Sequence, residues 1–438
     1  MTRILAIGLH YPPHHIGGYE VSCRDVMERL ADRGHEVAVL TSDLRRPGVS
    51  DPPGERDGRI PVCRDLVPWF RDEALWAPPW WARWRIERAN QRALVAALDR
   101  TRPDVVSAWQ LGGLSIGLLT TVARRGIPIV YALSDDWLSY APELDAWNRL
   151  FRRVPNPIAR LLGHVLRVPT TVPDLGSTGP FCFISDATRQ RAEQYTPWSM
   201  DDTALVYSGI DGRLFEPGDG QRGARPWGAG RLLYVGRYDP RKGIETTIRA
   251  MPQLPGMVLE VQGTGDAVER DRLAALAGNL GISDRVEFAA VDRAGLPDRY
   301  RAADLVVFPS EWEEPFGLVP VEAMACGTPV VATGVGGSNE FLVGGRNCIR
   351  FRSGDADDLA AAVRRVAADA DLRERMVADG FRTAEYFDVD RLADAFEAWH
   401  DAAAARFADG RPRSRSFDLD AVTADGPDGQ GTGGAAVR

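Results

Sequence analysis

Hydrophobic residues along the chain follow two alternating patterns, short continuous runs and longer stretches with helical spacing. Residues 3–9 form a nearly continuous apolar run, which is typical of a strand buried on both faces of a parallel sheet. In residues 19–33 the apolar side chains recur at helical spacing, and Gly34 follows where a helix can end on a left-handed residue. Residues 37–40 return to the strand pattern. The start of the chain therefore predicts a strand, a helix and a second strand.

The same alternation continues over two long stretches of the chain. The first stretch predicts strands at 104–108, 128–133 and 181–185, and a helix at 113–125. The second predicts strands at 231–235, 258–262, 286–288, 305–308 and 329–332, and helices at 243–251, 271–280 and 317–326. Strands that alternate with helices imply right-handed crossovers and parallel sheets. We therefore predict an α/β protein of two facing Rossmann-like, doubly wound domains with an inter-domain cleft.

Breaks in this alternation mark the boundaries of the predicted domains. Residues 140–180 are rich in proline and arginine, and we interpret them as an elaborated surface that faces a substrate. Residues 209–230 contain seven glycines and two prolines without periodicity, which is typical of a linker. We divide the chain into a first domain at 1–210, a linker at 211–230, a second domain at 231–385, a terminal amphipathic helix at 386–408 that packs back on the first domain, and a disordered tail at 409–438.

Composition and charge narrow the class of protein. The 438 residues, 44% of them hydrophobic, are enough for two domains with separate cores. A net charge of −8 argues against nucleic acid as a partner, because a surface that follows phosphates needs an excess of basic residues. The five cysteines are scattered singly, which favours reduced thiols in the cytoplasm over disulfides or a zinc site. No apolar run is long enough for a spanning helix, so we expect a cytoplasmic protein, free or peripheral on the inner membrane face.

The strongest candidate site lies in the segment PSEWEEPFGLVPVEAMACGTPVVAT. A predicted strand leads into a loop that contains Glu314, and Glu322 follows one turn into the predicted helix. The free N–H groups of Phe316, Gly317 and Leu318 at the helix start point to where ligands bind in open α/β sheets. Glu322 can accept hydrogen bonds from a diol such as a ribose, and Glu314 can address a sugar. The alternative is that both glutamates only favour the helix dipole.

A second candidate site lies in the segment YVGRYDPRKGIETTIRAM. Arg237 leaves the end of a predicted strand, and Lys242 stands just before a predicted helix. Two cations beside a helix amino terminus suit a diphosphate, because the helix end supplies N–H donors and the side chains neutralise charge. The alternative is that both side chains are solvated on the surface, as we expect for the neighbouring Arg241.

Paired glycines near the start of the chain form the third candidate. Gly17 and Gly18 open the first predicted helix, where residues without side chains let the backbone approach a phosphate closely. Such pairs are also common turns. A nicotinamide-dependent dehydrogenase with Asp43 as ribose ligand is disfavoured, because Gly8 is followed by histidines and prolines rather than by the G-x-G-x-x-G fingerprint.

Together these motifs resemble those of glycosyltransferase family 4, whose members are retaining enzymes with the GT-B fold that use nucleotide sugars. The likeness runs over residues 4–407 and includes the segment GGSNEFLVGGRNCIRFRSGDADDLA. The resemblance implies that the first domain binds the acceptor and the second binds the nucleotide sugar. It also implies that Arg237 and Lys242 bind the donor diphosphate, Glu322 the donor ribose, and Glu314 the donor sugar near its anomeric centre.

Two further contacts follow from the same resemblance. The backbone amides of residues 316–318 are expected to hold the sugar or phosphate, while Gly17 and Gly18 close on the diphosphate from the other domain. One position departs from the family pattern. Members often carry a histidine that faces the donor sugar in a run like H-D-x-W, and this chain has Ser134 there, in YALSDDWLSY.

Ser134 or the following Asp135 can replace the hydrogen bond of that histidine, and Ser134 lacks its acid/base capacity. Asp135 and Asp136 can also be interpreted as a metal pair. Two adjacent acids without a third ligand favour a helix start or a solvent-facing loop instead. The three histidines of the first loop likewise lack a carboxylate or cysteine partner at fixed spacing. We therefore predict no metal site and no cofactor.

Residues 76–94 combine four tryptophans with several arginines. This pattern is compatible with contact with an anionic membrane or with an acceptor. The alternative is a helix that packs on the first domain and leaves its arginines in solvent.

The resemblance implies transfer of a hexose-type sugar from a nucleoside diphosphate sugar to a sugar, lipid or small-molecule acceptor. It also implies front-side attack, in which the departing phosphate oxygen takes the acceptor proton. The motifs contain no convincing protein nucleophile, and the cations Arg237 and Lys242 supply the charge that the leaving diphosphate needs. The alternatives are a nucleotide-sugar epimerase on the same fold and a non-catalytic nucleotide-sugar-binding protein.

Overall fold

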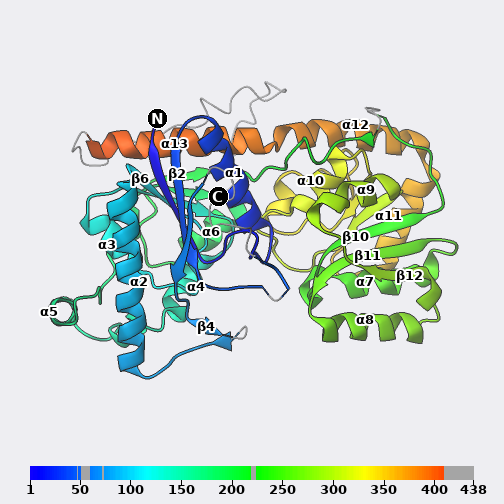
Figure 1. Cartoon of the computed structure of the whole chain (residues 1–438). Helices are drawn as coiled ribbons and strands as arrows, with labels where there is room; N and C mark the ends of the chain where they lie inside the picture. The colour runs from blue at the N-terminus through cyan, green and yellow to red at the C-terminus, as the bar shows by residue number, and fades with distance from the viewer. Residues whose placement is uncertain (47, 51–59, 72–73, 219–222, 409–438) are drawn as a thin grey trace, which may run out of the picture.

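A computed structural model describes residues 1–46, 48–50, 60–71, 74–218 and 223–408. The chain forms two α/β domains side by side, with a layer of long helices along one edge of both (Figure 1). Each domain contains a parallel sheet, which confirms the predicted fold class. The predicted tail at 409–438 lies outside the described residues. No helix in the described part of the chain is both long and apolar enough to cross a membrane.

The first domain is built on a seven-stranded parallel sheet in the order β3-β2-β1-β6-β7-β8-β9. Alternate residues of its central strand face two separate apolar clusters: Ile4 and Ala6 face one, and Leu5 and Ile7 face the other. Both faces are therefore buried, which explains the continuous apolar run. The strands are β1 (Arg3–Gly8), β2 (Glu36–Ser42), β3 (Val62–Leu66), β6 (Val105–Ala108), β7 (Ile129–Leu133), β8 (Phe181–Phe183) and β9 (Thr203–Leu205), with a separate antiparallel pair, β4 (Phe70–Arg71) and β5 (Ala74–Leu75). The helices are α1 (Gly18–Asp32), α2 (Trp80–Thr101), α3 (Gly117–Arg124), α4 (Trp137–Leu144), α5 (Asn156–Leu166) and α6 (Asp186–Tyr195).

The second domain repeats this plan with a six-stranded parallel sheet in the order β12-β11-β10-β13-β14-β15. In its central strand Leu232 and Tyr234 face one cluster and Leu233 faces the other. The strands are β10 (Arg231–Tyr238), β11 (Val258–Gly265), β12 (Val286–Ala289), β13 (Leu305–Phe308), β14 (Val330–Ala332) and β15 (Ile349–Arg350). The helices are α7 (Ile244–Ala250), α8 (Ala267–Asn279), α9 (Leu296–Ala302), α10 (Leu318–Ala325), α11 (Ala356–Ala368) and α12 (Ala370–Tyr386).

The order of the strands fixes where a ligand can bind. In the first sheet the order reverses between β1 and β6, and in the second it reverses between β10 and β13. Ligands of open α/β sheets bind beyond the carboxyl ends of the strands at such a switch point. The loops that follow these four strands are therefore the natural place for a site.

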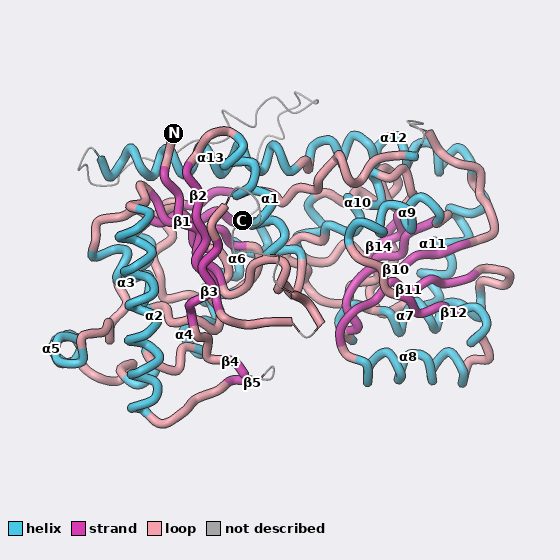
Figure 2. The backbone as a smooth tube through the Cα atoms, in the orientation of Figure 1, coloured by secondary structure: helices cyan, strands magenta, loops and turns pink. Residues whose placement is uncertain are grey.

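The chain crosses between the domains twice, and the two crossings are joined to each other. The N–H of Ile210 donates to the Phe387 carbonyl at 2.9 Å, and the N–H of Val389 donates to the Ile210 carbonyl at 2.9 Å. After the second crossing, α13 (Val389–Ala408) lies along the first domain (Figure 2). Its Phe396 and Trp399 share an apolar cluster with β1 and α1.

One strand prediction was too short. The strand expected at 231–235 continues to Tyr238, so Arg237 lies inside β10 rather than after it. The reason is that β11 also extends, and Arg237 pairs with Thr264 across the ladder.

The stretch at 140–180, where no regular pattern was found, contains helical elements. Most of α4 and all of α5 lie within it. A proline at position 142 inside α4 breaks the sequence signal for a helix. In α5 the apolar face points away from the core, so its periodicity does not mark a buried surface.

The buried Glu87 in α2 makes the free energy of unfolding depend on pH. Gln91 donates a hydrogen bond to its carboxylate at 2.8 Å, and burial raises the pKa of Glu87 to about 8 from an ordinary value of 4.5. At a pH between these two pKa values the folded chain holds a proton that the unfolded chain releases. The free energy of unfolding therefore falls as the pH rises from the lower value to the higher one. From about pH 5 to pH 8, we expect the free energy of unfolding of wild type to fall by about 3 kcal/mol more than that of Glu87→Gln.

Urea unfolding at the two pH values checks this prediction. The control is Glu374→Gln, at an exposed position of α12, which should leave the pH dependence unchanged. An identical pH dependence for Glu87→Gln and wild type would show that Glu87 is ionised in the folded chain.

Candidate active site at the domain boundary

The buried Glu314 forms an ion pair with the partly buried Lys242 beyond the ends of β13 and β10. The Lys242 Nζ lies 2.5 Å from the Glu314 Oε1, and the Ser310 hydroxyl donates to the same oxygen at 2.9 Å. The Lys242 ammonium also lies 5.2 Å from the ring centroid of Trp312. Glu314 is only 5% exposed, so its charge is neutralised locally and its carboxylate is held in one place. An ammonium has three N–H donors, so Lys242 keeps donors for a ligand.

Arg237 is more open than Lys242, with 45% of its side chain exposed. Its nearest carboxylate is that of Asp239, at 3.9 Å, and no described side-chain oxygen lies within hydrogen-bonding distance of its guanidinium. The guanidinium also acts across the domain boundary. Burial raises the pKa of Glu20 in α1, and the positive charge of Arg237 opposes that rise. Arg237 is thus a cation with unused donors at the boundary.

Glu322 lies in the second turn of α10 and is 8% exposed. The Tyr300 hydroxyl donates to its Oε2 at 2.7 Å. Burial raises the pKa of Glu322, while this hydrogen bond and the charge of Arg293 oppose the rise. Arg293 also reaches the first domain, where its Nη1 lies 3.2 Å from the Asp25 Oδ2.

The residues at the start of α10 contribute in different ways. The Phe316 side chain is buried, with its ring centroid 4.9 Å from that of Phe341, so only its backbone can face a ligand. Gly317 has φ +92°, and a Cβ there would lie 2.8 Å from the Phe308 ring. This position therefore requires glycine. The first N–H groups of a helix lack partners within the helix, which leaves donors at this end.

Gly17 and Gly18 lie opposite α10 in the first domain. The Gly17 N–H donates to the Glu20 carboxylate at 3.0 Å, which fixes the start of α1. A Cβ at Gly17 would meet nothing within 4 Å, and one at Gly18 would meet only the Leu318 Cδ1, at 3.7 Å. Protein packing therefore does not demand glycine at either position, and the missing side chains leave open space at the boundary.

Asp135 and Asp136 follow Ser134 at the end of β7 and have separate partners. Asp135 accepts hydrogen bonds from the Tyr140 hydroxyl at 2.7 Å and the Trp137 N–H at 3.1 Å. Burial raises the pKa of Asp135 to about 6. Asp136 pairs with Arg191 at 3.0 Å. The two acids therefore sit at a helix start, as one alternative expected, and both are partly exposed. In the described part of the chain no three His, Cys, Asp or Glu side chains are grouped as a metal site.

Several residues at the domain boundary were not identified from the sequence alone. Glu20 had a usable signal, because an acidic residue three positions after the N-cap glycine is typical of a capping interaction. Tyr300 and Arg191 had none. Arg191 reaches Glu313 of the second domain at 3.1 Å, and these residues lie 122 positions apart.

Two protein-family models match the chain, one in each half. Residues 16–212 match the family model described as Glycosyltransferase Family 4, and residues 222–383 match the one described as Glycosyl transferases group 1. The D-inositol 3-phosphate glycosyltransferase of Geodermatophilus obscurus is 34% identical to the chain over 438 residues, which cover 93% of this chain and 90% of that protein.

Solved structures agree on the fold. Sucrose-phosphate synthase from Thermosynechococcus elongatus has a TM-score of 0.68 and 23% identity, over 92% of this chain and 100% of that chain. The HepE protein of Anabaena, solved in complex with UDP-glucose, has a TM-score of 0.65 and 20% identity, over 92% of this chain and 100% of that chain. The chain therefore belongs to the glycosyltransferases of family 4 and has the GT-B fold, as its motifs predicted.

Proposed function

We propose that this glycosyltransferase is a retaining enzyme that moves a hexose-type sugar from a nucleoside diphosphate sugar to a hydroxyl of a sugar, lipid or small-molecule acceptor. The observation that carries the proposal is the position of two cations at the domain boundary. Lys242 is fixed by the buried Glu314, and Arg237 has unused donors. A diphosphate is the group that these two charges and the open space at Gly17 and Gly18 suit best.

The geometry of α10 supports the remaining donor contacts of this proposal. Glu322 is buried one turn into the helix, and only its Oε2 accepts from Tyr300, so its other oxygen can accept from a ribose hydroxyl. The backbone N–H groups of Phe316, Gly317 and Leu318 can donate to the sugar or to a phosphate. The UDP-glucose complex of HepE supports a donor of this class.

In the proposed reaction the bond between the anomeric carbon and the diphosphate breaks first. The electron pair stays on the leaving phosphate oxygen, where Arg237 and Lys242 neutralise it. The acceptor hydroxyl attacks from the same face, its oxygen bonds to the anomeric carbon, and its proton moves to that phosphate oxygen. The products are the glycosylated acceptor and a nucleoside diphosphate. Glu314 positions Lys242 and the sugar and forms no covalent intermediate.

We assign acceptor binding to the first domain, near the end of β7. Beside it, Ser134 offers a hydroxyl in place of the family histidine that faces the donor sugar, and this hydroxyl can hydrogen-bond that sugar without transferring a proton. Asp135 is oriented by Tyr140 and lies beside it. The name of the Geodermatophilus relative, a D-inositol 3-phosphate glycosyltransferase, supports a small polyol-type acceptor as the first class to test. No metal or cofactor is required in this proposal.

Glu314→Gln should separate binding from transfer. The substitution keeps the shape of the side chain and removes the charge that holds Lys242, so we expect transfer to fall by about a hundredfold or more. Nucleoside diphosphate binding should stay within a few-fold of wild type, because both cations remain. Transfer assays with isothermal titration calorimetry measure the two effects. Donor converted to an isomer without any acceptor would instead indicate an epimerase.

Arg237→Ala should weaken binding and transfer together. Loss of a charge-assisted contact to phosphate is expected to raise the Kd for a nucleoside diphosphate roughly tenfold to a hundredfold. Arg249→Ala is the matched control, because the Arg249 side chain is 52% exposed and pairs with Glu245 on α7. Calorimetry with both variants checks the prediction. Unchanged affinity in Arg237→Ala would exclude Arg237 from the diphosphate site.

A further inference from the structure

Helix α5 exposes its apolar face to solvent. Ile158, Leu161, Leu162 and Val165 are 52%, 67%, 36% and 72% exposed. Their spacing of three, four and seven positions places them on one side of the helix. The opposite side faces the protein, where Ala159 is 1% exposed. A surface helix of a globular domain normally buries its apolar face, whereas α5 turns its apolar face to solvent.

The attachment of α5 fixes this orientation. The Trp84 indole N–H donates to the Leu166 carbonyl at 3.0 Å, and the Thr170 hydroxyl donates to the Ala159 carbonyl at 2.5 Å. A Cβ at Gly163 would lie 2.7 Å from the Thr170 Oγ1, so the helix lies close against the following segment. Both ends of α5 are thus held, and its apolar side chains stay outside.

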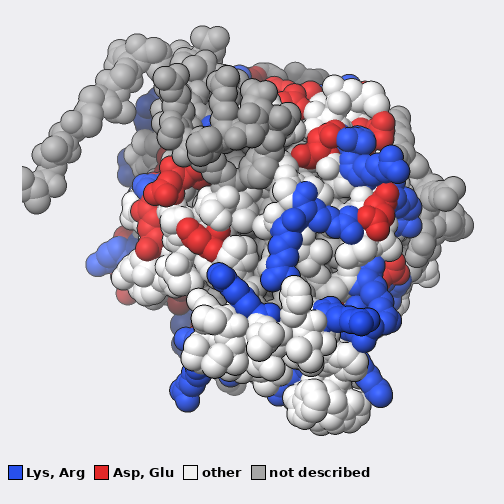
Figure 3. Space-filling model, turned by 90° about the vertical axis from the view of Figure 1, so that its left-hand side faces the viewer, with Lys and Arg blue, Asp and Glu red and all other residues white. Residues whose placement is uncertain are grey.

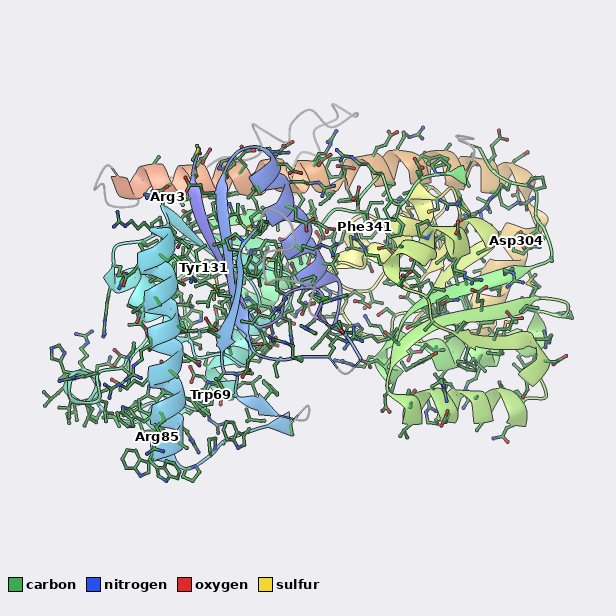
Figure 4. All side chains as sticks on the ribbon, in the orientation of Figure 1. Arg3, Trp69, Arg85, Tyr131, Asp304 and Phe341 are labelled. Atoms are coloured by element: carbon green, nitrogen blue, oxygen red, sulfur yellow. The ribbon has the colours of Figure 1, made fainter. Side chains whose placement is uncertain are left out.

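The start of α2 extends the same surface. Trp80 and Trp81 are 62% and 49% exposed, and the Arg85 guanidinium lies 5.3 Å from the Trp81 ring centroid. Arg85 lies at the end of α2 that is farther from α13 (Figure 4). Trp84 connects this end to α5. We call the exposed apolar residues of both helices the docking face; they are Trp80, Trp81, Ile158, Leu161, Leu162 and Val165.

Charge around the docking face differs from that of the whole chain. The full sequence carries a net charge of −8, whereas residues 149–167 contain five arginines and no aspartate or glutamate. Figure 3 shows Lys and Arg side chains along the edges of a broad uncharged bulge on this side of the molecule, with most acidic side chains in the upper part of the view. The five arginines are all exposed; they are Arg149, Arg152, Arg153, Arg160 and Arg167.

We propose that the docking face binds the surface of an anionic phospholipid bilayer. The aliphatic side chains of α5 enter the boundary between headgroups and acyl chains, the two tryptophans lie at headgroup level, and the arginines contact lipid phosphates. This differs from the expectation at 76–94, because α5 supplies most of the apolar surface. The proposal does not depend on the donor or acceptor of the reaction.

A second copy of the chain fits this face less well. A two-fold contact puts the same patch on both sides of the interface, so arginines would meet arginines, and the neighbouring acidic residue Glu143 is already paired with Arg152. Apolar side chains beside a rim with an excess of arginines, in which Glu143 pairs with Arg152, favour a partner that is itself apolar and negatively charged. An anionic membrane has both properties.

Co-sedimentation of the full chain with vesicles tests the proposal. We expect binding to vesicles of equal parts phosphatidylcholine and phosphatidylglycerol, and little binding to phosphatidylcholine alone. Leu161→Glu with Val165→Glu should lower the partition coefficient at least tenfold. Arg160→Glu with Arg167→Glu should lower it about fivefold for each arginine removed, with a steep dependence on salt.

Matched controls keep the outcome clear. Val268→Glu alters a valine that is 78% exposed on α8, and Arg365→Glu alters an exposed arginine on α11; both should bind vesicles like wild type. Nucleoside diphosphate binding, measured on every variant, reports folding separately from docking. The proposal would be overturned if wild type did not bind anionic vesicles. It would also be overturned if the docking-face variants bound them as strongly as wild type. A wild-type dimer that Leu161→Glu with Val165→Glu converts to a monomer, without vesicle binding, would overturn it as well.

Discussion

The backbone bridge between the two crossings of the chain is the constraint on which the rest of the structure depends. Ile210 exchanges hydrogen bonds with Phe387 and Val389, so the outgoing and returning segments lie side by side. The approach is close, since a Cβ at Gly209 would lie 2.6 Å from the Asp388 backbone. Because the segment that leaves the first domain and the segment that returns from the second meet at this point, α13 is directed back along the first domain.

Around that fixed point the domains meet through side chains. The Glu340 carboxylate accepts from the N–H groups of Asp186 and Ala187 at the start of α6, and Arg293 pairs with Asp25. Pairs of this kind at a partly exposed boundary contribute little free energy each. The backbone bridge does not depend on these side-chain contacts, because it is made by main-chain hydrogen bonds.

The sequence predicted what depends on local pattern. Strands such as β1 and β10 were found because both faces of each sheet are buried, which makes their residues continuously apolar. Lys242 and Glu314 could be predicted to lie near each other because each follows a central strand, although their direct pairing was not foreseen. Contacts such as Arg191 to Glu313 depend on how the two domains meet, and no local pattern encodes that. The helix α5 has the helical spacing of Ile158, Leu161, Leu162 and Val165, but it was missed because it lies within the proline- and arginine-rich residues 140–180.

The position of α5 connects the proposed docking to the geometry of the site. It lies at the end of the first domain that is farther from the second domain (Figure 1), so a membrane bound there leaves the domain boundary open. The chain runs from Asp135 at that boundary through α4 into α5, so one continuous segment links the proposed acceptor side to the docking face. Docking would thus fix the acceptor-binding domain on the membrane.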